Sequence, residues 1–156
     1  MRINLEINGN AKQWEIEPGE TLLNLLRRHG FYGVKKGCEE GYCGVCTVLI
    51  DGKPFNSCMI FAAKVNNAKI TTIEGLGTPR EPHLLQKVFA ESGAVQCGYC
   101  SPGFILTAKA LLEENPDPSE AEVKQALDGN YCRCTGYQKP IQAVLNAAKI
   151  MQGKGE

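Results

Sequence analysis

Eight cysteines in 156 residues, arranged as two sets of four, constrain this chain more than any other feature of its sequence. The first set is Cys38, Cys43, Cys46 and Cys58, with the spacing C-x4-C-x2-C-x11-C. The second set is Cys97, Cys100, Cys132 and Cys134, a C-x2-C pair followed by a C-x-C pair. A chain of this length has room for one ordinary domain or two small ones. Small domains that bury too little apolar surface can be stabilised by metal or cluster ligation.

The first set has the spacing of plant-type ferredoxins, in which four thiolates bind a [2Fe-2S] cluster. Such a cluster needs a loop that wraps around it, with backbone N–H groups turned toward the sulfurs. Gly37, Gly41 and Gly44 permit this wrapping, and Cys58 is expected to reach the cluster from a neighbouring strand. The alternative is a four-cysteine zinc site, but such sites usually pair two C-x2-4-C motifs, and Cys58 stands alone.

Charge and hydropathy exclude several classes of partner. Lys plus Arg and Asp plus Glu number 17 each, with no long run of one sign, which argues against nucleic acid or an anionic membrane as a partner. The chain begins with polar alternation rather than a signal peptide, and it has no run of roughly 18 consecutive apolar residues. We therefore expect a cytoplasmic protein whose cysteines are reduced and serve as metal ligands.

The first half of the sequence predicts strands and one helix. Apolar residues alternate on both sides of Asn8-Gly9, which predicts a β-hairpin. Thr21 is a candidate N-cap for a helix that ends near Gly30. Residues 33–46 predict an irregular loop, and further strands are expected at 47–50, toward Cys58 and at 69–73.

The second half predicts four short helices. Apolar stripes at helical spacing follow Pro82, Pro102, the capping-box pair Ser119 and Glu122, and Pro140. The helical flanks do not provide the βαβ context that a thioredoxin-like reading of Cys97-Gly98-Tyr99-Cys100 would need. The fold class is therefore α+β. We expect a first domain at residues 1–75, a Gly- and Pro-rich linker at 76–82, and a second domain at 83–156.

Three segments carry a family resemblance. Residues 96–103 (QCGYCSPG) and 129–137 (GNYCRCTGY) resemble the small iron-sulfur subunit of xanthine dehydrogenase-type molybdenum hydroxylases. Residues 37–48 resemble that family's N-terminal ferredoxin motif, and Cys58 its fourth ligand. The resemblance covers nearly the whole chain. It implies a β-grasp, plant-type ferredoxin-like domain followed by a four-helix domain, with one [2Fe-2S] cluster in each.

The resemblance also implies a function. The chain would be the electron-transfer subunit of a molybdenum-dependent oxidoreductase, with no catalytic residue of its own. Its partners would be a large molybdopterin-binding subunit and a medium FAD-binding subunit, in a heterotrimer or a dimer of heterotrimers. The second cysteine set would hold the cluster proximal to the molybdopterin, with Gln96 and Cys134 against that cofactor, and the first set would hold the distal cluster. Gln96 could instead make a hydrogen bond at a helix end.

Two other functions remain open from the sequence: a free two-cluster electron carrier, and a zinc-stabilised interaction module. A carrier would have a polar surface around both clusters, whereas a subunit would leave residues 96–102 and 131–137 apolar, to be covered by a partner. The sequence has no G-x-G-x-x-G motif or P-loop that would bind a nucleotide itself.

The remaining polar and aromatic candidates have simpler interpretations. His29 and His83, at a predicted helix end and helix start, are interpreted as capping or surface groups, because no acid-base partner is apparent. Lys35-Lys36 could be a docking patch, but a short charge pair is usually a solvated face. Three tyrosines beside the second cysteine set are expected to shield it: Tyr99, Tyr131 and Tyr137.

Overall fold

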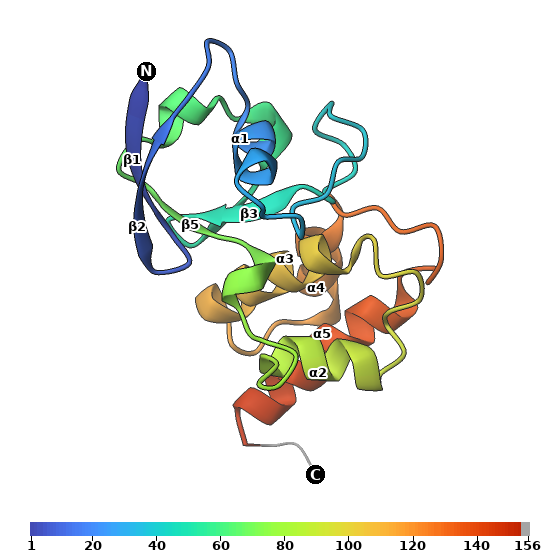
Figure 1. The fold of residues 1–156 in the computed structure, drawn as a ribbon. Coiled ribbons are helices and arrows are strands. Elements are labelled where there is room, and N and C mark those ends of the chain that lie inside the picture. Colours follow the sequence, from blue (N-terminus) through green and yellow to red (C-terminus); the bar gives the residue numbers. More distant parts are fainter. Residues whose placement is uncertain (154–156) are drawn as a thin grey trace.

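The computed structural model describes residues 1–153 of the chain. An N-terminal part contains a sheet and one helix, and a C-terminal part contains four helices (Figure 1). Residues 154–156, which the sequence assigned to the second domain, lie outside the described residues. The arrangement confirms the α+β prediction.

The sheet has five strands in the order β2-β1-β5-β3-β4. β1 pairs with β5 in parallel, and the other neighbours pair antiparallel. The strands are β1 (Arg2–Ile7), β2 (Asn10–Glu15), β3 (Thr47–Ile50), β4 (Lys53–Asn56) and β5 (Lys69–Thr71). Three short 3-10 helices follow β4 and β5: η1 (Ser57–Met59), η2 (Ala62–Val65) and η3 (Ile73–Gly75). The predicted hairpin and later strands are therefore present.

The turn of the first hairpin also holds the chain where it leaves the sheet. Asn8 and Gly9 have φ values of 50° and 79°, the left-handed conformation of a tight hairpin turn. The Asn8 side chain accepts a bond from the Thr72 backbone N–H (2.9 Å) and donates to the Thr72 hydroxyl (3.0 Å). That hydroxyl donates to Glu74 (2.6 Å), whose other carboxylate oxygen accepts from the Gly33 N–H (2.7 Å). Three separate segments thus meet in one polar network.

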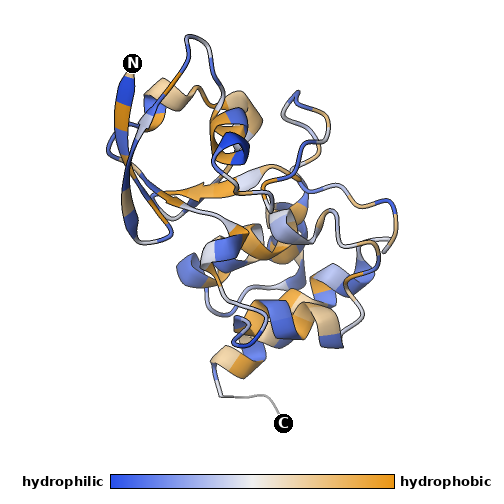
Figure 2. Cartoon of the chain, in the orientation of Figure 1, coloured by the Kyte–Doolittle hydropathy of each residue, from blue (hydrophilic) through white to orange (hydrophobic). Residues whose placement is uncertain are grey.

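Helix α1 (Leu22–Arg28) packs its apolar face on the sheet. Thr21 caps it as predicted, its hydroxyl accepting from the Asn24 N–H (3.3 Å). In Figure 2, β3 is hydrophobic along most of its length, whereas α1 has both hydrophobic and hydrophilic residues. The core consists mainly of alternate residues of β1 and the buried leucines of α1: Ile3, Leu5, Ile7, Leu22, Leu23, Leu25 and Leu26.

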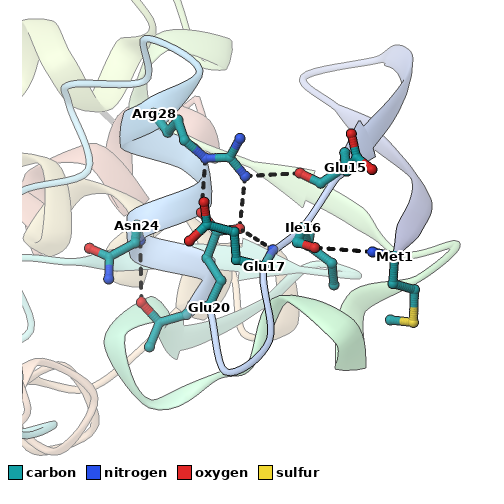
Figure 3. A network of polar contacts seen from close by, with 8 residues as sticks. Met1, Glu15, Ile16, Glu17, Glu20, Asn24 and Arg28 are labelled. Atoms are coloured by element: carbon teal, nitrogen blue, oxygen red, sulfur yellow. Dashed lines mark hydrogen bonds and ion pairs between the residues drawn. The ribbon is translucent and has the colours of Figure 1, made fainter.

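An ion pair joins α1 to the segment that follows β2 (Figure 3). Arg28 donates to both carboxylate oxygens of Glu20, at 2.8 and 3.0 Å, and to the Glu15 carbonyl (2.9 Å). Burial alone would raise the pKa of Glu20, but the hydrogen bond from Arg28 and a backbone N–H bond hold it below its ordinary value. At the same end of the sheet, the N-terminal ammonium of Met1 donates to the Ile16 carbonyl (3.2 Å).

The C-terminal part consists of α2 (Leu84–Glu91), α3 (Ser101–Glu114), α4 (Glu120–Leu127) and α5 (Gln138–Met151). Its core is formed by residues from all four helices, among them Leu85, Phe89, Phe104, Val123 and Val144. Helix α3 contacts β3 and β4 as well as the other helices, so it lies between the sheet and the rest of the helical part (Figure 1).

Capping explains where two of these helices begin. Ser119 and Glu122 form the predicted capping box of α4, and His83 and Gln86 form one for α2. The last helix was expected to open at Pro140, but α5 begins earlier, at Gln138. Pro140 still fits there, because the first-turn N–H groups of a helix have no intrahelical partner and proline has no N–H to leave unpaired.

The segment between the two parts is packed rather than extended. Ile73 in η3 and Leu76, the first residue of the predicted linker, both pack against the helical core. Within residues 1–153, none of the helices combines the length and apolar character that crossing a bilayer requires.

Candidate iron-sulfur centres

The first cysteine set lies in the predicted irregular loop and the segments next to it. Cys38 and Cys43 are in the loop after α1, and Cys46 directly precedes β3. Cys58 was expected on a strand, but it lies in η1, directly after β4. It is held close to the loop because the Ser57 hydroxyl donates to the Cys46 carbonyl (2.7 Å) and Asn56 donates to the Gly41 carbonyl (2.8 Å).

The four side chains of this set lie as two neighbouring pairs, Cys38 with Cys43 and Cys46 with Cys58. Backbone N–H groups surround the first pair: those of Glu40, Tyr42 and Cys43 donate to the Cys38 sulfur, each at 3.4 Å. In return, the Cys38 N–H donates to the Cys43 sulfur (3.4 Å). This is the pattern of N–H groups turned toward sulfur that a wrapped cluster loop was expected to have.

The two pairs differ in electrostatic character. Backbone hydrogen bonds, above all from the Glu40 N–H, lower the pKa of Cys38 to about 7. Burial raises the pKa of Cys58 to about 11, because a thiolate loses its hydration there. Cys38 is therefore prepared to carry negative charge, whereas Cys58 needs a bound cation to become a thiolate.

Two of the three loop glycines make room for this arrangement. A Cβ on Gly37 would lie 2.7 Å from the Cys43 sulfur, so no side chain fits there. Gly41 has φ +82°, and a Cβ on it would lie 2.9 Å from the Met59 side chain. Gly44 also has a positive φ, +69°, and in addition a Cβ on it would lie 2.3 Å from the carbonyl oxygen of Gly129 in the helical part.

The second cysteine set lies in two loops at the ends of helices. Cys97 and Cys100 precede α3, and Cys132 and Cys134 lie between α4 and α5. Their sulfurs also form two pairs: Cys134 with Cys97, at 3.6 Å, and Cys100 with Cys132. The first of these pairs is exposed, whereas Cys100 and Cys132 are half-buried.

The inner pair again combines one acidic and one buried thiol. Burial raises the pKa of Cys100 to about 12. Burial alone would also raise the pKa of Cys132, but donors from Thr135 and the Cys134 N–H lower it to about 7. The Thr135 hydroxyl lies 3.1 Å from the Cys132 sulfur, and the N–H groups of Thr135 and Cys134 lie 3.4 Å from it.

The pairing of sulfurs discriminates between the two kinds of metal site considered above. A zinc ion needs its four ligands to converge on one point, whereas the side chains of each set lie as two pairs. Two sulfurs on each of two irons is the requirement of a [2Fe-2S] cluster with four cysteine ligands. Each set has two such pairs, and backbone N–H groups donate to the sulfurs of Cys38, Cys43 and Cys132. Both features fit a [2Fe-2S] cluster.

The loops that carry the two cysteine sets lie on the same side of the molecule (Figure 1) and contact each other. The backbone N–H of Tyr131 donates to the Cys43 carbonyl (2.9 Å). The Tyr99 hydroxyl donates to the Lys36 carbonyl, and the Lys35 ammonium lies 5.8 Å from the Tyr99 ring centroid. The Lys35-Lys36 segment therefore faces the helical part, a position that neither sequence interpretation included.

The other predicted candidates have local roles. The Gln96 side chain donates to the Cys134 carbonyl (3.1 Å), so it connects the two loops of the second set. The Tyr137 hydroxyl accepts from the Cys132 N–H (3.1 Å). His83 caps α2, its Nδ1 accepting from the Leu85 N–H (3.2 Å), and His29 ends α1 and stacks on Trp14 at 3.9 Å between ring centroids.

Two residues of this region were missed by the sequence analysis. Thr135 donates both its hydroxyl and its N–H to the Cys132 sulfur, and a hydroxyl three residues after a cysteine is a signal that could have found it. Asn130 is buried between the two parts. A buried polar residue next to a cysteine motif gives no signal until the fold places a partner beside it.

Models of two protein families match the chain. A 2Fe-2S iron-sulfur cluster binding domain matches residues 5–70, and a [2Fe-2S] binding domain matches residues 72–145. Together they cover most of the sequence, with one cysteine set in each match.

Whole proteins are also similar to this chain. The nicotinate dehydrogenase small FeS subunit of Eubacterium barkeri is 51% identical over 94% of both chains. The solved structure of quinoline 2-oxidoreductase from Pseudomonas putida 86 contains a chain with 42% identity and a TM-score of 0.92, matched over 99% of this chain and 98% of that one.

A third relative is much longer than this chain. The structure of aldehyde oxidoreductase from Desulfovibrio gigas superposes with a TM-score of 0.95 and 42% identity over 99% of this chain, which spans only 17% of that protein. The two domain matches, the paired cysteine sulfurs and the full-length similarity to small subunits lead to one conclusion. The chain belongs to the small [2Fe-2S] iron-sulfur subunits of the xanthine dehydrogenase-type molybdenum hydroxylase family, and it is an electron-transfer subunit with two [2Fe-2S] clusters.

Proposed function

We propose that each cysteine set ligates one of the two clusters. Cys38, Cys43, Cys46 and Cys58 would hold the distal cluster, in a ferredoxin-like domain at residues 1–75. Cys97, Cys100, Cys132 and Cys134 would hold the proximal cluster, in a helical domain that begins at residue 83 after a linker at 76–82. The pairing of the sulfurs supports this assignment. When bound, a [2Fe-2S] cluster accepts and releases one electron at a time.

Exposure supports a proposal for where electrons enter the chain. The exposed pair, Cys97 and Cys134, is the edge of the second set that a cofactor on a partner can approach. We propose that this edge, with Gln96 bonded to the Cys134 carbonyl, lies against the molybdopterin of a large subunit. The inner pair, Cys100 and Cys132, lies toward the loop of Cys43.

One observation carries the proposed route through the chain. Tyr131 adjoins Cys132, and its backbone N–H donates directly to the carbonyl of Cys43. Electrons that enter at Cys134 would therefore cross from the second cysteine set to the first through one hydrogen bond between main-chain groups. From the first set they would pass to FAD on a medium subunit.

Apolar surface favours a subunit over a free carrier. Large hydrophobic side chains are exposed around the second cysteine set: Val95, Tyr99, Tyr131 and Tyr137. A partner that covers them would remove this surface from water. We propose a heterotrimer with the large and medium subunits, or a dimer of heterotrimers, in the cytoplasm, where reduced thiols are maintained.

Metal analysis of the natively purified protein, together with the chains that accompany it, tests this function. About four irons per chain, from two [2Fe-2S] clusters, with molybdenum and FAD in the accompanying chains, are expected. Iron without molybdenum or an accompanying chain would favour the free carrier. Zinc in place of iron would contradict the proposal.

A further inference from the structure

Asn130 lies at the junction between the sheet and the helices, and its side chain has an unusual environment. The residue is 4% exposed. Its side-chain nitrogen donates to the Thr107 hydroxyl (3.1 Å), but its side-chain oxygen is buried and has no conventional hydrogen-bond donor among the described residues. A buried, unpaired amide oxygen costs about 1–3 kcal/mol. An asparagine at this position, two residues before Cys132, therefore calls for a physical reason.

The surroundings of that oxygen come from both parts of the molecule. It would lie 2.9 Å from a Cβ built on Gly44 and 2.8 Å from a Cβ built on Gly103. In glycine a hydrogen occupies the direction of the missing Cβ, so both glycines direct a Cα–H bond toward the Asn130 oxygen. Such contacts are weak hydrogen bonds. The Asn130 amide thus joins the loop between Cys43 and Cys46 to helix α3, which follows Cys100.

The backbones at this junction are as close as glycine permits. A Cβ on Gly103 would lie 2.4 Å from the Gly44 carbonyl oxygen, and a Cβ on Gly44 would lie 2.3 Å from the Gly129 carbonyl oxygen. Backbone atoms cannot move aside as flexible side chains do. Three segments, each next to a cysteine of one of the sets, therefore keep their separation only while Gly44 and Gly103 have no side chain.

We propose that Asn130 is a positioning residue for electron transfer between the two clusters. Thr107 orients its amide, the amide holds the Gly44 loop against α3, and this contact keeps the neighbouring Tyr131 N–H on the Cys43 carbonyl. Asn130 touches neither cluster's sulfurs in this role. The inference rests on the proposed assignment of one cluster to each cysteine set.

The test compares Asn130→Ala with Gly129→Ala in the complete, cluster-loaded protein. Gly129 is adjacent, and a Cβ on it meets nothing within 4 Å, so it is a matched control. Electron paramagnetic resonance of the fully reduced protein measures the magnetic interaction between the clusters, which decreases steeply with their separation. Rapid freezing after partial reduction measures the rate of transfer between them.

We expect Asn130→Ala to keep both cluster signals, to weaken the magnetic interaction and to slow intercluster transfer several-fold, while Gly129→Ala resembles the unaltered protein. A role in stability alone would lower the free energy of unfolding without changing either readout. Unchanged interaction and rate in Asn130→Ala would overturn the inference.

Two further variants decide the matter if Asn130→Ala does not retain its clusters. Thr107→Val removes the hydroxyl that orients the amide, and Gly103→Ala separates α3 from the Gly44 carbonyl. Both should weaken the interaction, and an unchanged interaction in both contradicts the inference. The proposed function fails separately, if the unaltered protein does not contain two clusters or if a cysteine substitution in one set removes the cluster assigned to the other.

Discussion

The backbone N–H of Tyr131 donates to the carbonyl of Cys43 across a distance of 2.9 Å, so residues 88 positions apart in the sequence join the two cysteine sets. Both groups belong to the main chain. A substitution of the Tyr131 side chain therefore leaves the bond intact, whereas a change in the path of either loop breaks it. The contact depends on the relative position of the two parts of the molecule and not on the identity of residue 131.

Cys134→Ser is expected to remove the proximal cluster and to leave the distal one. The sulfur of Cys134 pairs with that of Cys97, 3.6 Å away, and serine offers a harder, less acidic ligand for the same iron. Electron transfer from the molybdenum subunit to FAD should stop. Cluster spectra measure the first effect and turnover measures the second.

Cys38→Ser is the reciprocal control, since it should remove the distal cluster signal and leave the proximal one. Equal loss of both signals in Cys134→Ser would show that the two sites assemble as one unit. Unchanged turnover would contradict the proposed route.

Gly37→Ala is expected to prevent loading of the distal cluster. A Cβ at this position would lie 2.7 Å from the Cys43 sulfur and 2.7 Å from the Val45 side chain, so the loop must shift where the ligands need a fixed geometry. The iron content should fall toward half, and spectra of the two clusters should show that the missing iron is that of the distal cluster. A full iron content would show that the loop adapts to the extra methyl group.

The sequence predicted local features well and contacts between the two parts poorly. Cysteine spacing, the Asn8-Gly9 turn and the Ser119 capping box each depend on residues close together in the chain, and all three were correctly interpreted. Gly44 was assigned to the wrapping of the cluster loop, and its φ of +69° agrees with that, but the sequence did not predict that a Cβ there would also meet the Gly129 carbonyl. That contact depends on how the sheet part and the helical part meet, which no local pattern encodes.

The same limit applies to single positions near the sites. Cys58 falls just beyond β4 because the chain turns into η1 at Ser57, whose hydroxyl bonds the Cys46 carbonyl. The Lys35-Lys36 pair contacts Tyr99, which is more than 60 residues away. Its charge pattern alone was consistent with solvent or with a docking partner.

Arg27→Lys is expected to weaken the loop that carries the first cysteine set. One nitrogen of the Arg27 guanidinium donates to the carbonyls of Val34 (2.8 Å) and Tyr32 (3.4 Å), and the guanidinium carbon lies 5.4 Å from the centroid of the Tyr32 ring. Lysine has no planar group to place over that ring, so it does not keep all three contacts in this geometry. Loss of a hydrogen bond to a charged group costs about 1.5–3 kcal/mol. Thermal release of the distal cluster should occur at a lower temperature, with the proximal cluster less affected.

The exposed Arg80 provides the control for that substitution, because Arg80→Lys makes the same chemical change away from the loop. If both variants released the distal cluster at the same temperature as the unaltered protein, Arg27 would have no part in holding the loop.

His83 should make stability depend on pH below the ordinary imidazole pKa of 6.5. Burial, with a smaller contribution from Lys109, lowers the pKa of His83 in the folded chain, and its neutral Nδ1 accepts the Leu85 N–H at the start of α2. The unfolded chain therefore binds the proton first. The stabilising contribution is complete above pH 6.5 and is lost as the pH falls through the folded-state pKa.

His83→Asn retains an N-cap that does not titrate, whereas His83→Ala should lose about 1 kcal/mol at neutral pH. Denaturant unfolding across this pH range should show the unaltered protein losing stability relative to His83→Asn as the pH falls. If the stability of the two proteins changed with pH in parallel, His83 would be excluded as the titrating group.

Asn8 stands in the turn of the first hairpin, and its side chain bonds both the N–H and the hydroxyl of Thr72, at the point where the chain turns toward the helices. Short hairpin turns on the surface are ordinarily the places where a protein tolerates inserted residues, epitope tags or fused domains. Here an insertion would displace Thr72 and the neighbouring η3, and, through Ile73, it would disturb the packing of the helical core. This turn is therefore a poor position for engineering, although it is exposed and distant in sequence from every cysteine.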